Sequence, residues 1–233
     1  MINQIEEAYR ENRDSWNEDH RIRVHRAISW LKSADKYQDD PDICFMSAVN
    51  AANACWGRPM THDKDAITML CKNLEGTGAL KKINSAFRSA EGERWLMILI
   101  SNKHLYWQYW RFLQGEIDAH EFNVKATGFK RYAIKAITEQ RYDYLLKSVL
   151  HQALAIRGQV FHGFTTYESS ANREVLELSA LMFRKLISVI VSEMIASPDK
   201  DWGTVPWTFG TDEQEYNLKK GAKSINRNIK NST

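Results

Sequence analysis

Apolar residues recur with a helical period along nearly the whole chain. Between turns they return every three to four residues, which is the spacing that places them on one face of an α-helix. Only four prolines occur in 233 residues, and Pro41, Pro59 and Pro198 stand where this periodicity stops. The sequence therefore predicts an all-α fold. The expected helices cover about 2–13, 15–37, 42–56, 63–74, 80–87, 95–100, 105–113, 129–139, 142–164 and 174–196, with a loop or broken helix at 116–128.

The chain divides into one helical domain and a tail. Residues 1–197 are enough to bury a sizeable core, and the segment 42–56, which is almost free of polar residues, is the expected centre of that core. Residues 198–233 form the predicted tail, which we expect to be flexible. Its last part, 218–233, has five basic residues and no acidic one, and such a tail would raise affinity for RNA by releasing counterions.

Charge and cysteine content limit the classes of protein to which the chain can belong. The net charge of +3 is compatible with nucleic-acid binding but does not demand it. The three cysteines, Cys44, Cys55 and Cys71, form no C-x-x-C pair, so a disulfide framework is not expected. With neither a signal-peptide pattern nor a run of about 18 apolar residues, we expect a cytoplasmic protein. The histidines form no metal-ligand motif, so we expect no metal and no cofactor.

The predicted helix 142–164 holds the candidate site. On a helical wheel its polar arc includes Ala155, Gln159 and His162, while Arg157 falls within the apolar arc. A buried guanidinium without a partner is very costly, so Arg157 must reach solvent, deform the helix beside Gly158, or be held for a purpose.

Arg157 and His162 together favour phosphate chemistry. Residues five positions apart point about 140° from one another on a regular helix, so they converge either where the helix end is distorted or across a two-fold axis between two copies. The small side chain of Ala155 would let a second helix approach closely. An arginine can grip a phosphate and stabilise charge that develops on it, and a histidine can exchange a proton near neutral pH.

These residues resemble a known signature. Arg157, the four residues after it and His162 resemble the R-x4-H motif of the HEPN superfamily, small all-helical proteins that include ribonucleases, toxins and defence effectors. Segments 28–35 and 40–54 resemble the early helix pair of the same family. The resemblance covers roughly 20–57 and 140–197, and it implies a HEPN-like bundle with extra helices in the middle.

The resemblance implies a function. It is that of a metal-independent endoribonuclease in which the ribose 2′-hydroxyl attacks the adjacent phosphate to leave a 2′,3′-cyclic phosphate. Arg157 and His162 would be catalytic and Gln159 would help to bind the substrate. The implied partners are an RNA substrate (tRNA or mRNA), a second copy of the chain in a homodimer, and an antitoxin or trigger protein that restrains a toxin or phage-defence effector.

Two positions differ from the family pattern. Gly158 stands where a polar residue such as asparagine is frequent, which makes Gln159 the candidate source of an amide. Phe164 stands where some HEPN toxins have a tyrosine that a partner nucleotidyltransferase modifies. Phenylalanine has no hydroxyl, so control by that route is not expected.

Other interpretations stay open at this point. The same helices would form a non-catalytic dimer that binds a nucleotide, RNA or protein, or a structural protein in which Arg157 is merely salt-bridged and points away from His162. The aromatic stretch 105–113 predicts core fillers more readily than a surface that stacks bases. His151, about 16 Å along the helix from His162, is not expected to share its pocket.

Overall fold

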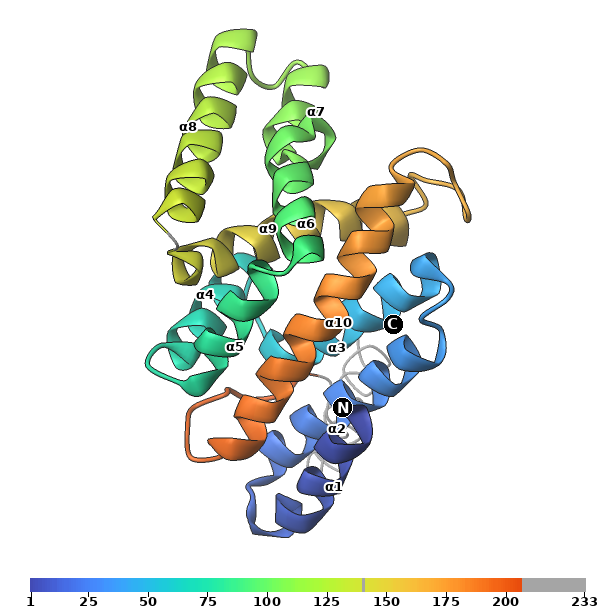
Figure 1. Ribbon diagram of the computed structural model, residues 1–233, viewed down its shortest axis with the longest axis vertical. Coiled ribbons are helices and arrows are strands. Elements are labelled where there is room, and N and C mark those ends of the chain that lie inside the picture. Colours follow the sequence, from blue (N-terminus) through green and yellow to red (C-terminus); the bar gives the residue numbers. More distant parts are fainter. Residues whose placement is uncertain (140, 207–233) are drawn as a thin grey trace, which may run out of the picture.

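The computed structural model describes residues 1–139 and 141–206, without the side chains of 142–144, and every regular element in this part of the chain is a helix (Figure 1). The prediction of an all-α fold is therefore confirmed. The α-helices are α1 (Ile2–Asn12), α2 (Glu18–Lys36), α3 (Pro41–Trp56), α4 (Asp63–Leu74), α5 (Gly78–Phe87), α6 (Ala90–Ser101), α7 (Trp107–Leu113), α8 (Ala119–Thr138), α9 (Tyr142–Phe161) and α10 (Arg173–Ala196). Short 3₁₀ turns η1 (Arg13–Ser15) and η2 (Lys103–Leu105) precede α2 and α7.

The core lies between α2, α3 and α10. Asp40 caps α3, because its carboxylate accepts the backbone N–H of Ile43, and Pro41 follows in the first turn. Three alanines of α3, Ala48, Ala51 and Ala52, are fully buried, and their small side chains let α2 and α10 approach on two sides. The segment predicted as the centre of the core therefore occupies that position.

A helical hairpin of α7 and α8 projects away from this core at the top of the view (Figure 1). The expectation of a loop or broken helix at 116–128 is wrong for most of its length. The side chain of Asp118 caps α8 by accepting the N–H of Glu121, and the helix then runs unbroken through Gly128. Gly128 is tolerated because a glycine inside a helix costs only about 1 kcal/mol relative to alanine.

The aromatic stretch is not the set of core fillers that we expected. Leu105 and Tyr106 are buried, but no residue of α7 itself is buried. Helix α8 packs against α7, and Ala133 and Ala136 are the only described residues of α8 that are buried. The rings of α7 are therefore half-buried or exposed.

The start of the predicted tail packs against the body. Trp202 and Val205 are buried, and the fully buried guanidinium of Arg23 donates to the carbonyls of Gly203 and Thr204 at 3.2 and 2.9 Å. Burial lowers the pKa of Arg23 to about 10, so it stays charged at neutral pH. The remainder of the expected tail, 207–233, lies outside the described residues.

Candidate active site at the end of helix α9

Helix α9 ends in a geometry that its sequence dictates. His162 is the C-cap residue, and Gly163 follows with a φ of +70°, a conformation that residues with a Cβ adopt only with strain. The N–H of Phe164 donates to the carbonyl of Gln159 at 2.9 Å, and the N–H of Gly163 donates to that of Val160 at 3.4 Å. This pair of hydrogen bonds is the Schellman motif, which turns the chain away from the helix axis directly after His162.

A cleft of about 1000 Å³ opens along the C-terminal half of α9. Its walls come from α9, the loop that joins α9 to α10, the start of α10, the η2–α7 segment and one residue of α4. Arg157, Gln159 and His162 all line it, so the structure brings the three predicted site residues to one cavity within a single chain. A second copy of the chain is not needed for Arg157 and His162 to share a cavity.

The imidazole of His162 lies against the last turn of the helix. A Cβ at Gly158 would stand 4.0 Å from the Cδ2 atom of His162, with no other heavy atom of a neighbouring group closer than that. His162 is exposed to solvent, and its ring centroid is 5.8 Å from that of Phe164. The histidine therefore has room to meet a ligand that enters the cleft.

Arg157 neither snorkels freely nor deforms the helix. Its Nη1 atom donates to Oδ2 of Asp63, the first residue of α4, at 2.8 Å. The arginine side chain is 27% exposed and the aspartate side chain 39% exposed. This bond uses one N–H of the guanidinium, so the arginine is held in place while its other donors remain for a ligand.

Gln159 has a structural bond as well as a place in the cleft. Its Nε2 atom donates to the carbonyl of His104 at 3.1 Å, and the indole Nε1 of Trp110 donates to the same carbonyl at 2.9 Å. Together these bonds tie the segment that leads into α7 to the end of α9. The predicted role of Gln159 in substrate binding would fall to its amide oxygen, which this bond does not use.

The cleft has a positive lining. Among the described residues that border it, Lys64 and Arg157 are cationic and none is acidic. His104, His151 and His162 add three imidazoles. Such a lining attracts an anion, and Asp63 neutralises part of the charge from behind Arg157.

His151 borders the same cleft, contrary to our expectation, because the cleft extends along several turns of α9. Burial lowers the pKa of His151, the backbone carbonyl of Lys64 raises it less, and the charges of Lys147 and Lys64 lower it further. Its Nε2 atom is buried without a hydrogen-bond partner in the described structure. His151 is therefore a neutral group at physiological pH.

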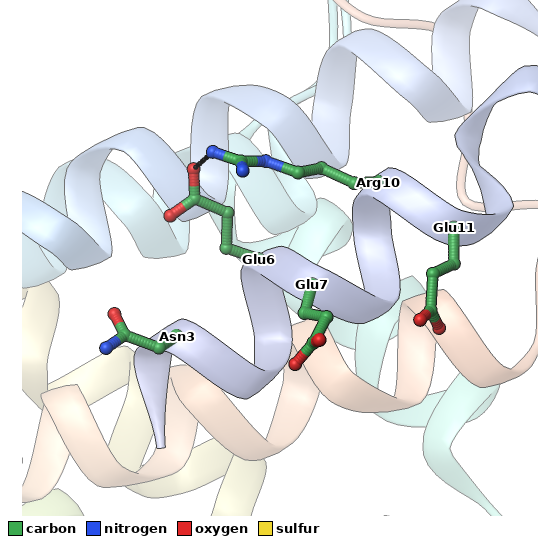
Figure 2. A pocket seen from close by; sticks show the side chains of 5 residues that line it. All are labelled: Asn3, Glu6, Glu7, Arg10 and Glu11. Carbon is green, nitrogen blue, oxygen red and sulfur yellow. Dashed lines mark hydrogen bonds and ion pairs between the residues drawn. The ribbon is translucent and has the colours of Figure 1, made fainter.

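Another hollow, of about 460 Å³, lies along α1 and carries no comparable chemistry. Figure 2 shows that all five of its lining residues come from this one helix, with Arg10 paired to Glu6 at 2.6 Å. Glu7 and Glu11 point away from that pair. Because groups from a single exposed helix do not converge, the hollow is part of an ordinary charged surface.

Sequence reasoning missed two groups at the site. Asp63 lies 94 residues from Arg157, and no local pattern signals that they meet. Trp107 is 64% exposed and lines the cleft, although the sequence suggested a buried aromatic stripe. The unusual density of rings in 105–113 was the one available signal for it.

No protein-family model, curated protein or solved structure matched the chain. Within residues 1–139 and 141–206, no three His, Cys, Asp or Glu side chains come together as a metal site. None of the helices described is both long enough and apolar enough to cross a membrane.

Proposed function

We propose that the chain is a metal-independent endoribonuclease whose active site is the cleft at the end of α9. The observation that carries this proposal is that Arg157 and His162 line one cavity that has no acidic residue among its described lining. A guanidinium beside an imidazole, in a cleft that attracts anions, suits the transfer of a phosphoryl group to a hydroxyl. The finer assignment to a HEPN-like bundle is part of the same proposal, since it rests on the R-x4-H motif at the end of this helix.

The reaction needs only groups of the RNA and of this chain, together with water. Arg157 binds the non-bridging oxygens of the phosphate, where negative charge builds up in the transition state. The 2′-oxygen forms a bond to phosphorus while the bond from phosphorus to the 5′-oxygen breaks. His162 takes the proton of the 2′-hydroxyl or gives one to the leaving 5′-oxygen, and water serves the opposite end. The products are a 2′,3′-cyclic phosphate and a 5′-hydroxyl.

Asp63 is a positioning residue in this scheme. A long side chain such as arginine has many rotamers, and fixing it before the substrate arrives removes that cost from the reaction. The single bond from Nη1 to Asp63 fixes the guanidinium and leaves its remaining donors for the phosphate.

The proposed setting is a homodimer that acts as a toxin or phage-defence effector on tRNA or mRNA, restrained by an antitoxin or trigger protein. Ala155 lines the cleft beside the predicted site residues, so a second copy that approaches there would enlarge or close it. Light scattering on the purified protein reports the oligomeric state.

The test is cleavage of total RNA and tRNA in EDTA. We expect the wild-type protein to yield fragments that end in a cyclic phosphate, and Arg157→Ala and His162→Ala each to lower the rate by about 100-fold or more. Arg21→Ala and His120→Ala are matched controls, because both residues are exposed and neither lines the cleft. Cleavage that persists at full rate in both cleft variants would rule out this site.

A second candidate is a non-catalytic module that binds nucleotides or RNA. The ion pair between Arg157 and Asp63 and the positive lining of the cleft fit this candidate, because a guanidinium that is held in place binds a phosphate whether or not a bond then breaks. The two candidates differ in one outcome. An RNA-binding module would bind RNA through Arg157, measured by filter binding, and would leave that RNA intact with every variant.

A further inference from the structure

Two large aromatic side chains border the cleft and are exposed to solvent. Trp107 is 64% exposed and Phe164 is 78% exposed, and both line the cavity that holds Arg157 and His162. A single exposed ring on a protein surface is unremarkable. Two exposed rings at the mouth of one positively lined cleft offer flat apolar faces beside groups that bind phosphate.

Both rings are attached to firmly held backbone. The turn that Gly163 makes sets Phe164 beside His162, with 5.8 Å between the ring centroids. Farther along the same loop, the hydroxyl of Tyr167 donates to Oδ2 of Asp40, just before α3, at 2.7 Å.

Trp107 is the first residue of α7, and the segment before it is fastened to α9. The carbonyl of His104 accepts hydrogen bonds from the side chains of Gln159 and Trp110, which belong to α9 and α7. The position of Trp107 relative to the end of α9 is therefore set by the fold, not by the entering ligand. An aromatic surface that is fixed in advance costs little to order when a planar group stacks on it.

We propose that Trp107 and Phe164 stack on bases that neighbour the phosphate held by Arg157 and His162, so the substrate is unpaired RNA. This inference rests on the proposed ribonuclease function and names its substrate class. Base-on-aromatic stacking works with any base, because every base has a π-face. It requires bases that are free to leave their neighbours, whereas the bases of a duplex are already stacked on each other and paired.

The size of the cleft agrees with this substrate. At about 1000 Å³ it lies at the upper end of the range for small-ligand sites, which gives it room for more than one nucleotide. In this proposal the cationic and the aromatic side chains bind different parts of the RNA. Arg157 and Lys64 meet the backbone phosphates, and the two aromatic side chains meet the bases.

The experiment uses a single-stranded 2′-O-methyl RNA that cannot be cut, because it has no 2′-hydroxyl, and that carries the fluorescent base 2-aminopurine. Stacking quenches this fluorophore, and fluorescence anisotropy gives the Kd. We expect quenching with the wild-type protein and a Kd about 5- to 150-fold weaker for Trp107→Ala and for Phe164→Ala. Trp107→Phe should restore much of the affinity, since it keeps an aromatic face.

Trp30→Ala is the matched control, because Trp30 is 43% exposed on α2 and does not line the cleft. Circular dichroism checks that each variant keeps its helix content. Affinity and quenching that stay at the wild-type level in both Trp107→Ala and Phe164→Ala would overturn the inference. Equal competition by a fully paired 2′-O-methyl duplex would overturn it as well.

The same proteins tested on unmodified RNA separate this inference from the proposed function. Cleavage that depends on His162 but not on Trp107 or Phe164 would leave the ribonuclease in place and remove the stacking surface. Binding and quenching that depend on Trp107, without any cleavage, would support the stacking surface and contradict the ribonuclease.

Discussion

The α2–α3–α10 core and the cleft end of α9 each hold an arginine among apolar side chains, and they hold it differently. Arg23 is fully buried, and it donates to five backbone carbonyls at 2.9 to 3.2 Å. Arg157 is 27% exposed in its side chain and has one carboxylate partner, Asp63, at 2.8 Å. The Nη1 and Nη2 donors of Arg23 all serve backbone carbonyls, and only its buried Nε has no partner among the described residues, whereas Arg157 keeps donors beside a cleft.

The difference separates a structural arginine from one that we propose to be functional. Arg23 donates hydrogen bonds both to the end of α3 and to the chain that follows α10, so it holds these two segments together. Removal of such a group leaves buried acceptors without donors, which costs free energy of unfolding. Removal of Arg157 breaks one partly exposed ion pair, and pairs of that kind contribute about 0–1 kcal/mol. Arg23 therefore contributes to stability, and chemistry is the role that we propose for Arg157.

The largest effect on stability is expected from Arg23→Ala. The free energy of unfolding should fall by at least about 3 kcal/mol, because five carbonyls lose their donor and a cavity remains. Urea denaturation followed by circular dichroism measures this change. Arg21→Ala, at an exposed position of the same helix, should change it by less than about 0.5 kcal/mol. A loss below about 1 kcal/mol for Arg23→Ala would erase the contrast between the two arginines.

Two glycines are expected to affect stability in opposite directions, one at the cleft end of α9 and the other inside α8. Gly163→Ala should lower the free energy of unfolding by about 1–2 kcal/mol, because alanine is strained at a φ of +70°, and should slow RNA cleavage by displacing His162. Gly128→Ala should instead raise it by about 0.5–1 kcal/mol, because Gly128 lies inside α8 with no atom within 4 Å of a new Cβ. Thermal unfolding distinguishes the two signs. A stabilised Gly163→Ala would contradict the described helix end.

Asp63→Ala tests whether a single partner is enough to position Arg157. The rate of RNA cleavage under saturating substrate should fall about 10-fold, since the guanidinium loses its anchor and a full 1 Å misplacement costs about 100-fold, while stability changes by less than about 1 kcal/mol. Asp65→Ala, on an exposed position of the same helix, is the matched control. A faster enzyme would mean that Asp63 competes with the phosphate for Arg157 instead of positioning it.

The smallest expected effect is the pH dependence of the free energy of unfolding that comes from His20 in the core. Burial lowers the pKa of His20, against a weaker opposite effect of the Met194 carbonyl, with a further lowering by the charge of Arg23. The folded state therefore binds this proton less readily than the unfolded state, whose histidine titrates near 6.5. Stability should fall as the pH drops below about 6.5, by no more than about 1.4 kcal/mol per pH unit from this group.

Urea titrations at pH 7.5 and 5.5 measure that slope above the range in which carboxylates titrate. His151 adds to it in the same direction, because burial lowers its pKa too. His20→Gln should flatten the slope, whereas His120→Gln, at an exposed position of α8, should leave it unchanged. Equal slopes in all three proteins would show that His20 is not held neutral in the core.

The sequence predicted most helices because their signals are local. Caps and apolar periodicity mark both ends of α3, and six apolar residues in a row at 95–100 form part of a helix, α6, as expected. This helix is buried on one face only, since Met97 is 56% exposed. The start of α8 was missed, because the segment before Gly128 has few apolar residues to mark a face. An exposed hairpin helix needs only a narrow apolar side.

The candidate site was predictable in part. The spacing of Arg157 and His162 is local, and Gly163 marks the helix end that lets both residues border one cleft. Asp63 was not predictable, because its contact with Arg157 joins distant parts of the chain. The exposure of Trp107 was not predictable either, since whether an aromatic stripe is buried depends on what packs over it.

Attack by the 2′-hydroxyl, with His162 moving the proton, is tested by cleavage of an RNA whose cut position has first been mapped with the wild-type protein in EDTA. One 2′-deoxy nucleotide is then placed on the 5′ side of that position. We expect cleavage to stop there, and mass spectrometry of the unmodified RNA to show a 2′,3′-cyclic phosphate that His162→Ala does not produce. Cleavage across the 2′-deoxy position, or the same cyclic phosphate from His162→Ala, would contradict this mechanism.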